Sequence, residues 1–396
     1  MKELQYRGEP VGTPPKVNAH LHTPYSFSAF RDIDDALERA VAEEVKVVGI
    51  NDFYTTEGYK EWAEGCKKRE LYPLFGIEFI SLNEEDQRVG LRVNDPANPG
   101  RTYLSGKGLA YPFSLDEPYA SQLTTVQSES NRQVETMCVK LNELLQSEQI
   151  GFTLDPDRIK KELTNGALRE RHLARALRMK VGEYYNNDEP LIRSVLEKLF
   201  SGKALKSPWG DIAGVEIEIR ANLLKAGGAA FVPEDPAAFL PMQSVCKIIL
   251  AAGGIPTYPF LGDDAKGGYT DFENDLERVA KQLTERGFYS VEFITTRNDL
   301  YLLEKYAGYL HDQGFLVTFG SEHNSPVMEP VELFARHGTP LTDRLKQINY
   351  EGACVIAAHQ HLVNEGLEGY LDDEGVADIS KREEFIDLGA QLIAHR

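Results

Sequence analysis

A short run near the N-terminus places two histidines two positions apart, at His20 and His22, inside the segment Val17–Thr23. The segment has the length and composition of a β-strand, in which alternate side chains point to the same face. On a strand, two imidazoles at this spacing can bind one metal ion while Leu21 packs behind them. Because pairs of this kind are also common on protein surfaces, the rest of the chain has to decide between the two interpretations.

Further along the chain, short apolar runs end in a carboxylate or a histidine. These side chains are Asp52, Glu78, Glu322 and His323. In a β/α barrel the C-terminal ends of the strands meet at one mouth, so residues far apart in sequence can share a site. Imidazoles and carboxylates suit zinc, manganese or iron, and a bridging carboxylate can hold two such ions. The pattern therefore predicts a metal site at a barrel mouth, with hydrolysis as the natural reaction class.

The alternation of strands and helices is interrupted once. A stretch rich in Gly, Pro and Asn begins near residue 84, and a mostly helical segment follows it until about 205. We therefore expect a first part of the barrel at 1–85, an irregular and helical insertion at 86–210, a second part of the barrel at 211–330, and a C-terminal helical extension at 331–396.

The composition excludes several classes of protein. A net charge of −19 over 396 residues argues against a surface that binds long nucleic acid and favours small substrates. The four cysteines are isolated from one another, so they indicate neither a disulfide framework nor a zinc knuckle. The chain has no apolar stretch typical of a signal peptide or a membrane span. We therefore expect a cytoplasmic protein without a membrane partner.

Taken together, these motifs resemble the polymerase and histidinol phosphatase (PHP) family of metal-dependent phosphoesterases over about residues 16–326. The resemblance lies in His-Leu-His-Thr at 20–23, the strand ending in Asp52, Gly-Ile-Glu at 76–78, Gly-Gly-Ile-Pro at 253–256 and Gly-Ser-Glu-His at 320–323. It is closest to the stand-alone branch that acts on nucleotides and short RNA, whose helical insertion carries a motif similar to 169–175. The resemblance implies an α/β fold: a distorted (β/α)7 PHP-type barrel with a mostly helical insertion and a helical C-terminal tail.

The chain also departs from the family pattern at positions where the family has metal ligands. Phe27, Phe53 and Tyr258 stand where the family has an aspartate and two histidines. In the last motif the histidine is shifted by one residue, so Asn324 takes its usual place. We therefore expect one tightly bound ion, a second weaker ion bridged by Glu78, and an empty third site filled by the rings of Phe27 and Phe53.

The resemblance implies the metal ligands, and the residue types themselves indicate the other candidate site residues. The metal ligands are His20, His22, Glu78 and Glu322, with His172 as a further candidate. The candidate catalytic residues are Asp52, His323 and Arg171. The candidate substrate-binding residues are Arg169, Arg175, Lys225 and Tyr258.

Some of these assignments have alternatives. Asp52 could orient a metal-binding imidazole instead of touching the ion. Neighbouring residues on a strand point to opposite faces, so Glu322 and His323 cannot both enter the site without a bulge. The arginines at 169, 171 and 175 could bind a phosphate or form a solvated basic face, and His172 could lie on a helix surface.

These expectations favour a hydrolase that uses one or two divalent transition-metal ions (zinc, manganese or iron) to cleave a phosphate ester of a small metabolite or nucleotide. Metal-activated water would attack phosphorus, and nearby basic side chains would neutralise the phosphate. Two alternatives remain open at this stage. The barrel could bind a metabolite or a single metal without phosphoesterase activity, or it could be a mononuclear metal enzyme acting on a carbohydrate or carboxylate substrate.

Overall fold

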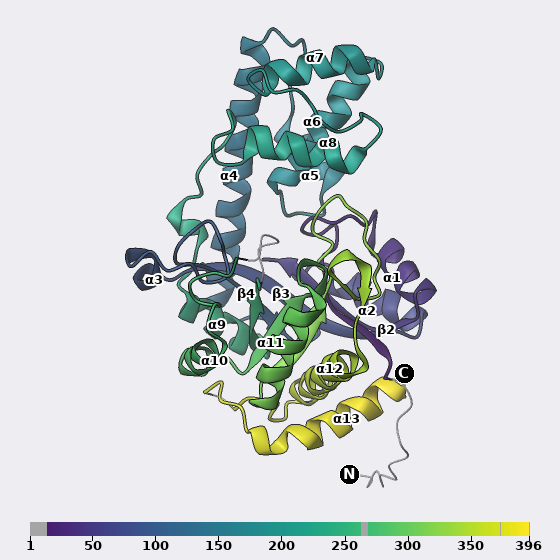
Figure 1. Cartoon of the computed structure of the whole chain (residues 1–396), viewed down its shortest axis with the longest axis vertical. Coiled ribbons are helices and arrows are strands. Elements are labelled where there is room, and N and C mark those ends of the chain that lie inside the picture. The colour runs from purple at the N-terminus through teal and green to yellow at the C-terminus, as the bar shows by residue number, and fades with distance from the viewer. Residues whose placement is uncertain (1–13, 263–267, 373, 396) are drawn as a thin grey trace.

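The computed structural model describes residues 14–262, 268–372 and 374–395, and its centre is a sheet of seven strands in sequential order (Figure 1). The strands are β1 (Lys16–Leu21), β2 (Val45–Phe53), β3 (Tyr72–Leu82), β4 (Arg101–Lys107), β5 (Ile255–Phe260), β6 (Ser290–Ile294) and β7 (Leu316–Gly320). Neighbouring strands are parallel, except that β4 runs antiparallel to both β3 and β5.

The first and last strands meet just beyond β7, so the sheet is a nearly closed barrel. Glu322 forms a parallel bridge with Leu21. The backbone N–H of His22 donates to the carbonyl of Glu322 at 2.7 Å, and the N–H of Glu322 donates to the carbonyl of His20 at 3.0 Å. The barrel therefore closes at His20 and His22.

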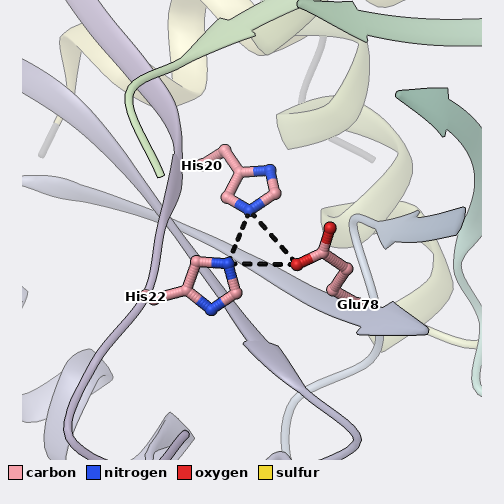
Figure 2. Close-up of side chains that lie close together, drawn as sticks. All are labelled: His20, His22 and Glu78. Atoms are coloured by element: carbon pink, nitrogen blue, oxygen red, sulfur yellow. Dashed lines mark hydrogen bonds and ion pairs between the residues drawn. The ribbon is translucent and has the colours of Figure 1, made fainter. Parts of the chain in front are cut away.

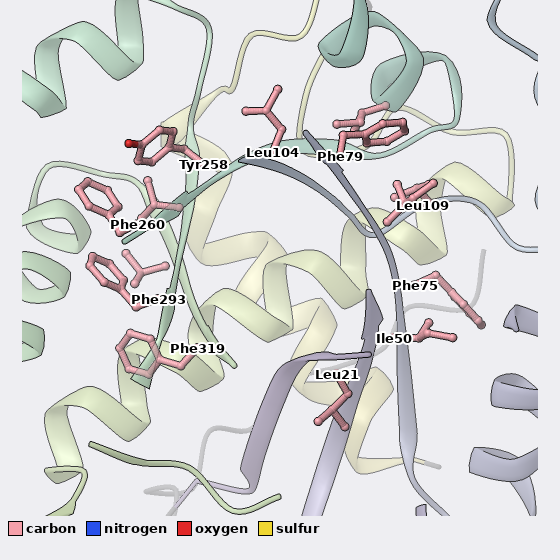
Figure 3. Close-up of a cluster of buried hydrophobic side chains, with 14 of the residues drawn as sticks. Leu21, Ile50, Phe75, Phe79, Leu104, Leu109, Tyr258, Phe260, Phe293 and Phe319 are labelled. Carbon is pink, nitrogen blue, oxygen red and sulfur yellow. The ribbon is translucent and has the colours of Figure 1, made fainter. Parts of the chain in front are cut away.

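The barrel has an unusual distribution of polar residues between its two faces. Leu21, Ile50, Phe75, Phe293 and Phe319 belong to a buried apolar cluster outside the barrel (Figure 3). Their neighbours along the strands point inward and are polar or small, and these inward residues include Asn18, His20, Asn51, Gly76, Glu78, Ser105, Lys107, Glu292 and Thr318. Alternation along each strand thus produces an apolar shell around a polar interior.

Helices surround this barrel. Those that precede the insertion are α1 (Ile33–Ala42), α2 (Tyr59–Lys68) and the short α3 (Glu84–Arg88). Those in the second half of the barrel are α9 (Met242–Ala251), α10 (Leu276–Glu285) and α11 (Leu300–Asp312), with short helical turns η2 (Pro236–Ala238) and η3 (Thr295–Arg297). In the described part of the chain, no helix combines the length and the apolar character needed to cross a membrane.

Between β4 and β5 the chain forms a separate bundle, which we call the helical insertion. It consists of α4 (Tyr119–Ser147), α5 (Pro156–Leu163), α6 (Glu170–Tyr184), α7 (Glu189–Leu199), α8 (Ile212–Ile219) and the π-helical turn η1 (Arg220–Leu224). The bundle stands above the barrel in Figure 1, joined to it by the long α4. It has its own apolar core, which includes Leu141, Leu173, Leu196 and Leu223.

The C-terminal extension covers the opposite end of the barrel, where the strands begin. It contains a small hairpin of β8 (Phe334–Ala335) and β9 (Thr339–Pro340) around the turn η4 (Arg336–Gly338), and then α12 (Asp343–Asn364), η5 (Ile379–Lys381) and α13 (Arg382–Ala394). The amide of Asn349 on α12 accepts from Phe319 N–H and donates to the carbonyl of Val17. The amide of Gln360 binds the backbone of Pro73 and Phe75 on β3. This helix therefore ties three strands together.

The expected α/β barrel of seven strands, with a helical insertion and a helical C-terminal tail, is confirmed. The structure differs from the expected division of the chain at two places. Strand β4 lies inside the stretch 86–210 that we assigned to the insertion, and α8 with η1 lies inside 211–330 but packs in the insertion. The sequence hid β4 because its inward side chains are polar, so the strand lacks the apolar pattern of its neighbours.

The contact between α12 and β7 yields a prediction about stability. A Cβ at Gly352 would lie 2.2 Å from the carbonyl oxygen of Val317. We expect Gly352→Ala to lower the free energy of unfolding by about 1–3 kcal/mol, measured by urea denaturation, because the backbone has to shift. The matched control is Gly210→Ala, where a Cβ meets nothing within 4 Å. Equal stabilities of the two variants would contradict this packing.

Candidate metal centre

Three buried ligand atoms converge at the barrel mouth: Nε2 of His20, Nε2 of His22 and Oε2 of Glu78 (Figure 2). The two nitrogens are 3.1 Å apart. Glu78 Oε2 lies 3.0 Å from the nitrogen of His22 and 3.9 Å from that of His20. Two ligand atoms that each lie about 2.1 Å from one ion, at tetrahedral or octahedral angles, are separated by roughly 3.0–3.4 Å. The two distances to His22 Nε2 lie in this range, and the distance of 3.9 Å between His20 and Glu78 is slightly longer, so the three atoms can surround a single ion after a small adjustment of Glu78.

The partners of the two imidazoles decide which nitrogen of each ring carries the proton. His20 Nδ1 lies 3.0 Å from the carboxylate of Glu292, which can only accept. His22 Nδ1 lies 3.1 Å from Ser26 Oγ, and that hydroxyl donates its own hydrogen to Asp52. Both rings therefore carry the proton on Nδ1, and both Nε2 lone pairs face the shared point.

Such an arrangement is repulsive unless a cation occupies the point between the atoms. Two nitrogen lone pairs face each other there, and Glu78 Oε2 receives no hydrogen bond although it is buried. Burial holds the pKa of His22 well below its usual value, so a second proton on this ring is unfavourable. Burial and the nearby Glu322 raise the pKa of Glu78. A divalent ion would satisfy all three atoms, so these residues fit a metal site.

A buried ion pair lies behind His20. Lys107 on β4 contacts Glu292 on β6 at 2.7 Å, and it also donates to the carbonyl of Ala19 and the amide oxygen of Asn51. The other carboxylate oxygen of Glu292 accepts from Ser105. Burial opposes the charge of Glu292, but Lys107 and His20 outweigh it and hold the pKa of Glu292 well below its usual range. Glu292 is therefore a fixed anion that orients His20.

Glu292 and Lys107 were missed by the sequence reasoning. Each lies in a strand next to apolar residues, and a charged side chain at such a position signals a buried ion pair. Asn51 shares this environment. Its amide nitrogen lies 3.2 Å from Nδ1 and 3.1 Å from Nε2 of His20.

A cavity of about 840 Å³ separates the barrel mouth from the helical insertion. Glu78 and Glu322 line its barrel side, together with Phe27 and Phe53. The insertion contributes five charged residues to the opposite wall, namely Arg169, Glu170, Arg171, Arg220 and Lys225. Since only one of the five is acidic, the wall that faces the metal centre is positively charged.

Two of these guanidinium groups have no carboxylate partner among the described residues. Arg169 donates to Ser130 and lies over the ring of Phe53 at 4.6 Å. The ring of Phe53 also stacks with His22, with 5.1 Å between the ring centroids. Arg171 lies over the ring of Phe27, at 5.7 Å from its centroid. Burial, and then the neighbouring Arg220, lower the pKa of Arg171 to about 10, so it stays charged near neutral pH. The expected positions of Phe27 and Phe53 beside the ligands agree with these contacts.

Three other predicted residues at the mouth are bound by neighbouring side chains or backbone groups of the protein. Glu322 is bound by Arg297, at 2.5 Å from Nη2 to Oε2. Lys225 contacts Glu170 at 3.2 Å and lines the cavity. Asp52 accepts hydrogen bonds from Thr23 and from Ser26. Its Oδ1 lies 3.8 Å from His22 Nδ1, so the hydrogen-bonded link between the two side chains runs through the serine. Burial outweighs these bonds and raises the pKa of Asp52 to about 6.

Two histidines that we predicted in the site turn away from it. The ring of His172 accepts at Nδ1 from the N–H of Arg169 and so caps the start of α6. His323 contacts Ser321 and the carbonyl of Glu329, and it stacks on Phe30 at 4.5 Å. Neither ring belongs to the group of converging ligand atoms. Local geometry explains both results, because a helix start needs a cap and the strand end directs only Glu322 inward.

Two predicted substrate contacts are structural as well. Tyr258 packs among phenylalanine rings outside the barrel and donates its hydroxyl to Glu273. Arg175 contacts Glu216 at 3.5 Å and donates to the carbonyl of Ser28, which joins the insertion to the barrel. Neither side chain lines the cavity. The strand register turns Tyr258 outward, and Arg175 lies one helical turn too far along α6.

Comparisons with known proteins agree with this geometry. The family model of the PHP domain matches residues 18–165. No curated protein matches the sequence significantly. A structure described as a candidate metal-dependent phosphoesterase from Bifidobacterium adolescentis has a TM-score of 0.54 at 16% identity, covering 85% of this chain and 96% of that one. An amidohydrolase from Chromobacterium violaceum, with bound sulfate and no metal, has a TM-score of 0.51 at 18% identity, covering 84% and 96%. These likenesses support a PHP-type fold.

The contact between Glu292 and His20 generates a prediction about metal affinity. We expect Glu292→Gln to weaken binding of a divalent metal by about 10- to 100-fold, because an amide orients and polarises the imidazole less well than a carboxylate. Isothermal titration with Zn²⁺ or Mn²⁺ measures the change. Glu273→Gln is the control, since Glu273 is equally buried but bonds to Tyr258. Unchanged affinity in Glu292→Gln would refute the orienting role.

The environment of Glu273 also predicts how stability depends on pH. Burial outweighs the bonds from Gly262 and Tyr258 and raises the pKa of Glu273 to about 7. Because the folded state binds this proton more tightly than the unfolded chain, its contribution is complete below about pH 4.5 and is lost as the pH rises through 7.

We therefore expect the stability difference between the wild type and Glu273→Gln to fall by about 2 kcal/mol from pH 5 to pH 8. Urea denaturation of both proteins across this range measures the difference. A constant difference would show that Glu273 is ionised in the folded state throughout.

Proposed function

Starting from a barrel of the PHP type, we propose that this protein is a metal-dependent hydrolase of phosphate esters. The observation that supports the proposal most directly is the opposition of two groups across one cavity. Three converging metal-ligand atoms lie on the barrel side, and the unpaired guanidinium of Arg171 lies on the insertion side. A phosphate between them would meet a Lewis acid on one side and a fixed cation on the other.

His20, His22 and Glu78 would hold the ion, and Glu292 and Ser26 keep the two imidazoles in the correct tautomer. When bound, the ion supplies Lewis acidity, which activates water and offsets charge on a phosphoryl oxygen. Arg171 would bind the nonbridging phosphate oxygens through its forked donors. The stack of Arg169 on Phe53 places a second guanidinium beside the same ligands. Burial of the centre excludes bulk water, which strengthens these electrostatic contacts.

We further propose that the substrate is a small phosphorylated metabolite or a nucleotide, and that long nucleic acid is excluded. The cavity volume lies within the range of about 300–1,000 Å³ that is common for small-molecule sites. Rings of Tyr54 and Tyr103 line it and offer apolar contacts to the part of the substrate beyond the phosphate. The net charge of −19 would repel a long polyanion outside this pocket.

The test is hydrolysis of a panel of phosphate esters, including nucleotides, sugar phosphates and a generic aryl phosphate, with Zn²⁺, Mn²⁺ or Fe²⁺ supplied in turn. We expect turnover that His20→Ala/His22→Ala abolishes. Amides are included because one structural neighbour is described as an amidohydrolase. Tight metal binding without hydrolysis of any ester would favour a barrel that only binds a metal or metabolite, and hydrolysis of amides alone would favour a different enzyme.

Arg171 provides a sharper prediction once a substrate is found. We expect Arg171→Met to lower kcat/KM by about 10- to 100-fold, because a charged hydrogen bond to phosphate is lost. Arg171→Lys should recover part of that loss, since it keeps the charge but not the fork. Arg158→Met is the control, because Arg158 lies exposed on α5 of the same insertion. A full rate in Arg171→Met would remove this residue from the proposed phosphate site.

A further inference from the structure

The carboxylate of Glu322 faces the metal centre but is bound by a protein cation. Arg297 ends the short turn η3, directly after β6, and its Nη2 lies 2.5 Å from Glu322 Oε2. Both side chains line the cavity. Among the described residues, Arg297 has no other carboxylate within ion-pair distance. Arg297 and Glu322 therefore form an ion pair at the barrel mouth.

The backbone of Glu322 is fixed so that this pairing is built into the fold. Its N–H and carbonyl bond to β1 on either side of Leu21. Its φ is +62°, and that of His323 is +59°, a region that costs a residue with a side chain about 1–3 kcal/mol. This conformation turns the carboxylate of Glu322 toward the mouth while His323 packs on Phe30. The strain is retained at the point where the barrel closes.

Glu322 and Glu78 both line the cavity at the barrel mouth. After burial, Glu322 is the largest influence that raises the pKa of Glu78, and Arg297 acts in the opposite direction. Even so, Glu322 does not belong to the group of converging ligand atoms. Each of the two carboxylates thus has its own source of positive charge, which is the metal position for Glu78 and Arg297 for Glu322.

The other side chains that could complete a second metal site have protein partners. Asp52 accepts from Thr23 and Ser26, and His172 caps α6. In the part of the chain that the structure describes, His20, His22 and Glu78 are the one group of at least three His, Cys, Asp or Glu residues whose ligand atoms converge.

Two of the four carboxylates around the centre are paired with protein cations. Lys107 binds Glu292 and Arg297 binds Glu322, which leaves Asp52 and Glu78 without a lysine or arginine partner among the described residues. Arg169 and Arg171 add positive charge on the opposite wall of the same cavity. A second divalent ion at the mouth would lie close to several protein cations, which is unfavourable.

We propose that Arg297 is a fixed cation of this centre, which withholds Glu322 from metal binding and limits the site to one ion. The inference rests on the proposed function, because both need an ion at His20, His22 and Glu78. It assigns to Arg297 the positive charge that a second ion would otherwise supply at the mouth.

The experiment counts metal ions and does not depend on activity. Chelator-washed full-length protein is titrated with Mn²⁺ and with Zn²⁺ by calorimetry, and bound metal is measured by elemental analysis after desalting. We expect about one equivalent in the wild type and about two in Arg297→Met, the second binding more weakly through the freed carboxylate. Arg297→Lys should stay at about one equivalent, and Arg297→Met/Glu322→Gln should return to about one, because the added ligand is gone.

Glu322→Gln alone gives a second, independent test. If Arg297 already withholds Glu322, the affinity for the first ion should change by less than about threefold, whereas loss of a true ligand would cost far more. Arg286→Met is the matched control. Arg286 forms an ion pair with Asp86 at 2.9 Å, and neither residue lines the cavity. It should leave the metal count unchanged.

The outcomes separate this inference from the proposed function. Two equivalents in the wild type, an unchanged count in Arg297→Met, or a loss of affinity of tenfold or more in Glu322→Gln would overturn the role of Arg297 and leave the hydrolase proposal standing. A wild type that binds no metal would overturn both. A wild type with one equivalent that hydrolyses no ester would overturn the proposed function alone.

Discussion

Two backbone hydrogen bonds between Glu322 and β1 hold the candidate site together. They join the first and last strands at His20 and His22, so the barrel closes where the candidate metal ligands lie. The approach is close, because a Cβ at Gly320 would lie 2.2 Å from Cβ of His20. Closure sets the direction of both imidazoles and of the Glu322 carboxylate at once. A change in register of one residue would turn all three outward.

The polar interior of the barrel follows from the same constraint. Apolar burial stabilises this fold on the outer face of the strands, under the surrounding helices, so the interior is free to hold charge. Buried charges are unfavourable unless they are paired and hydrogen-bonded, and the pairing of Glu292 with Lys107 and His20 meets this condition. Oε2 of Glu78 receives no hydrogen bond from the described residues although it is buried. The group formed by His20, His22 and Glu78 is therefore consistent with a metal site.

The helical insertion adds the second half of the proposed site. Its own apolar core makes it a separate bundle, and α6 starts beside the barrel mouth because His172 caps the helix there. The same helix start carries Arg169 and Arg171 into the cavity, while Arg175 anchors the helix to the barrel loop at Ser28. One short motif in the sequence thus contains a cap, two cavity residues and an anchor. The spacing of these residues along the sequence does not distinguish the three roles.

The sequence by itself indicated a strand–helix barrel interrupted by a helical segment and a metal site at the strand ends, and the resemblance to the PHP family implied the seven strands and the ligands His20, His22 and Glu78. Each of these depends on short-range patterns, namely the alternation along a strand and the position of a side chain at a strand end. The tertiary structure decided which polar groups are satisfied by the protein. Glu292 reaches His20 from 272 residues away, Arg297 reaches Glu322 from 25, and Tyr258 faces outward because of strand register. Hydrogen bonds and ion pairs of this kind depend on distances across the barrel, which the spacing of residues along the chain does not specify.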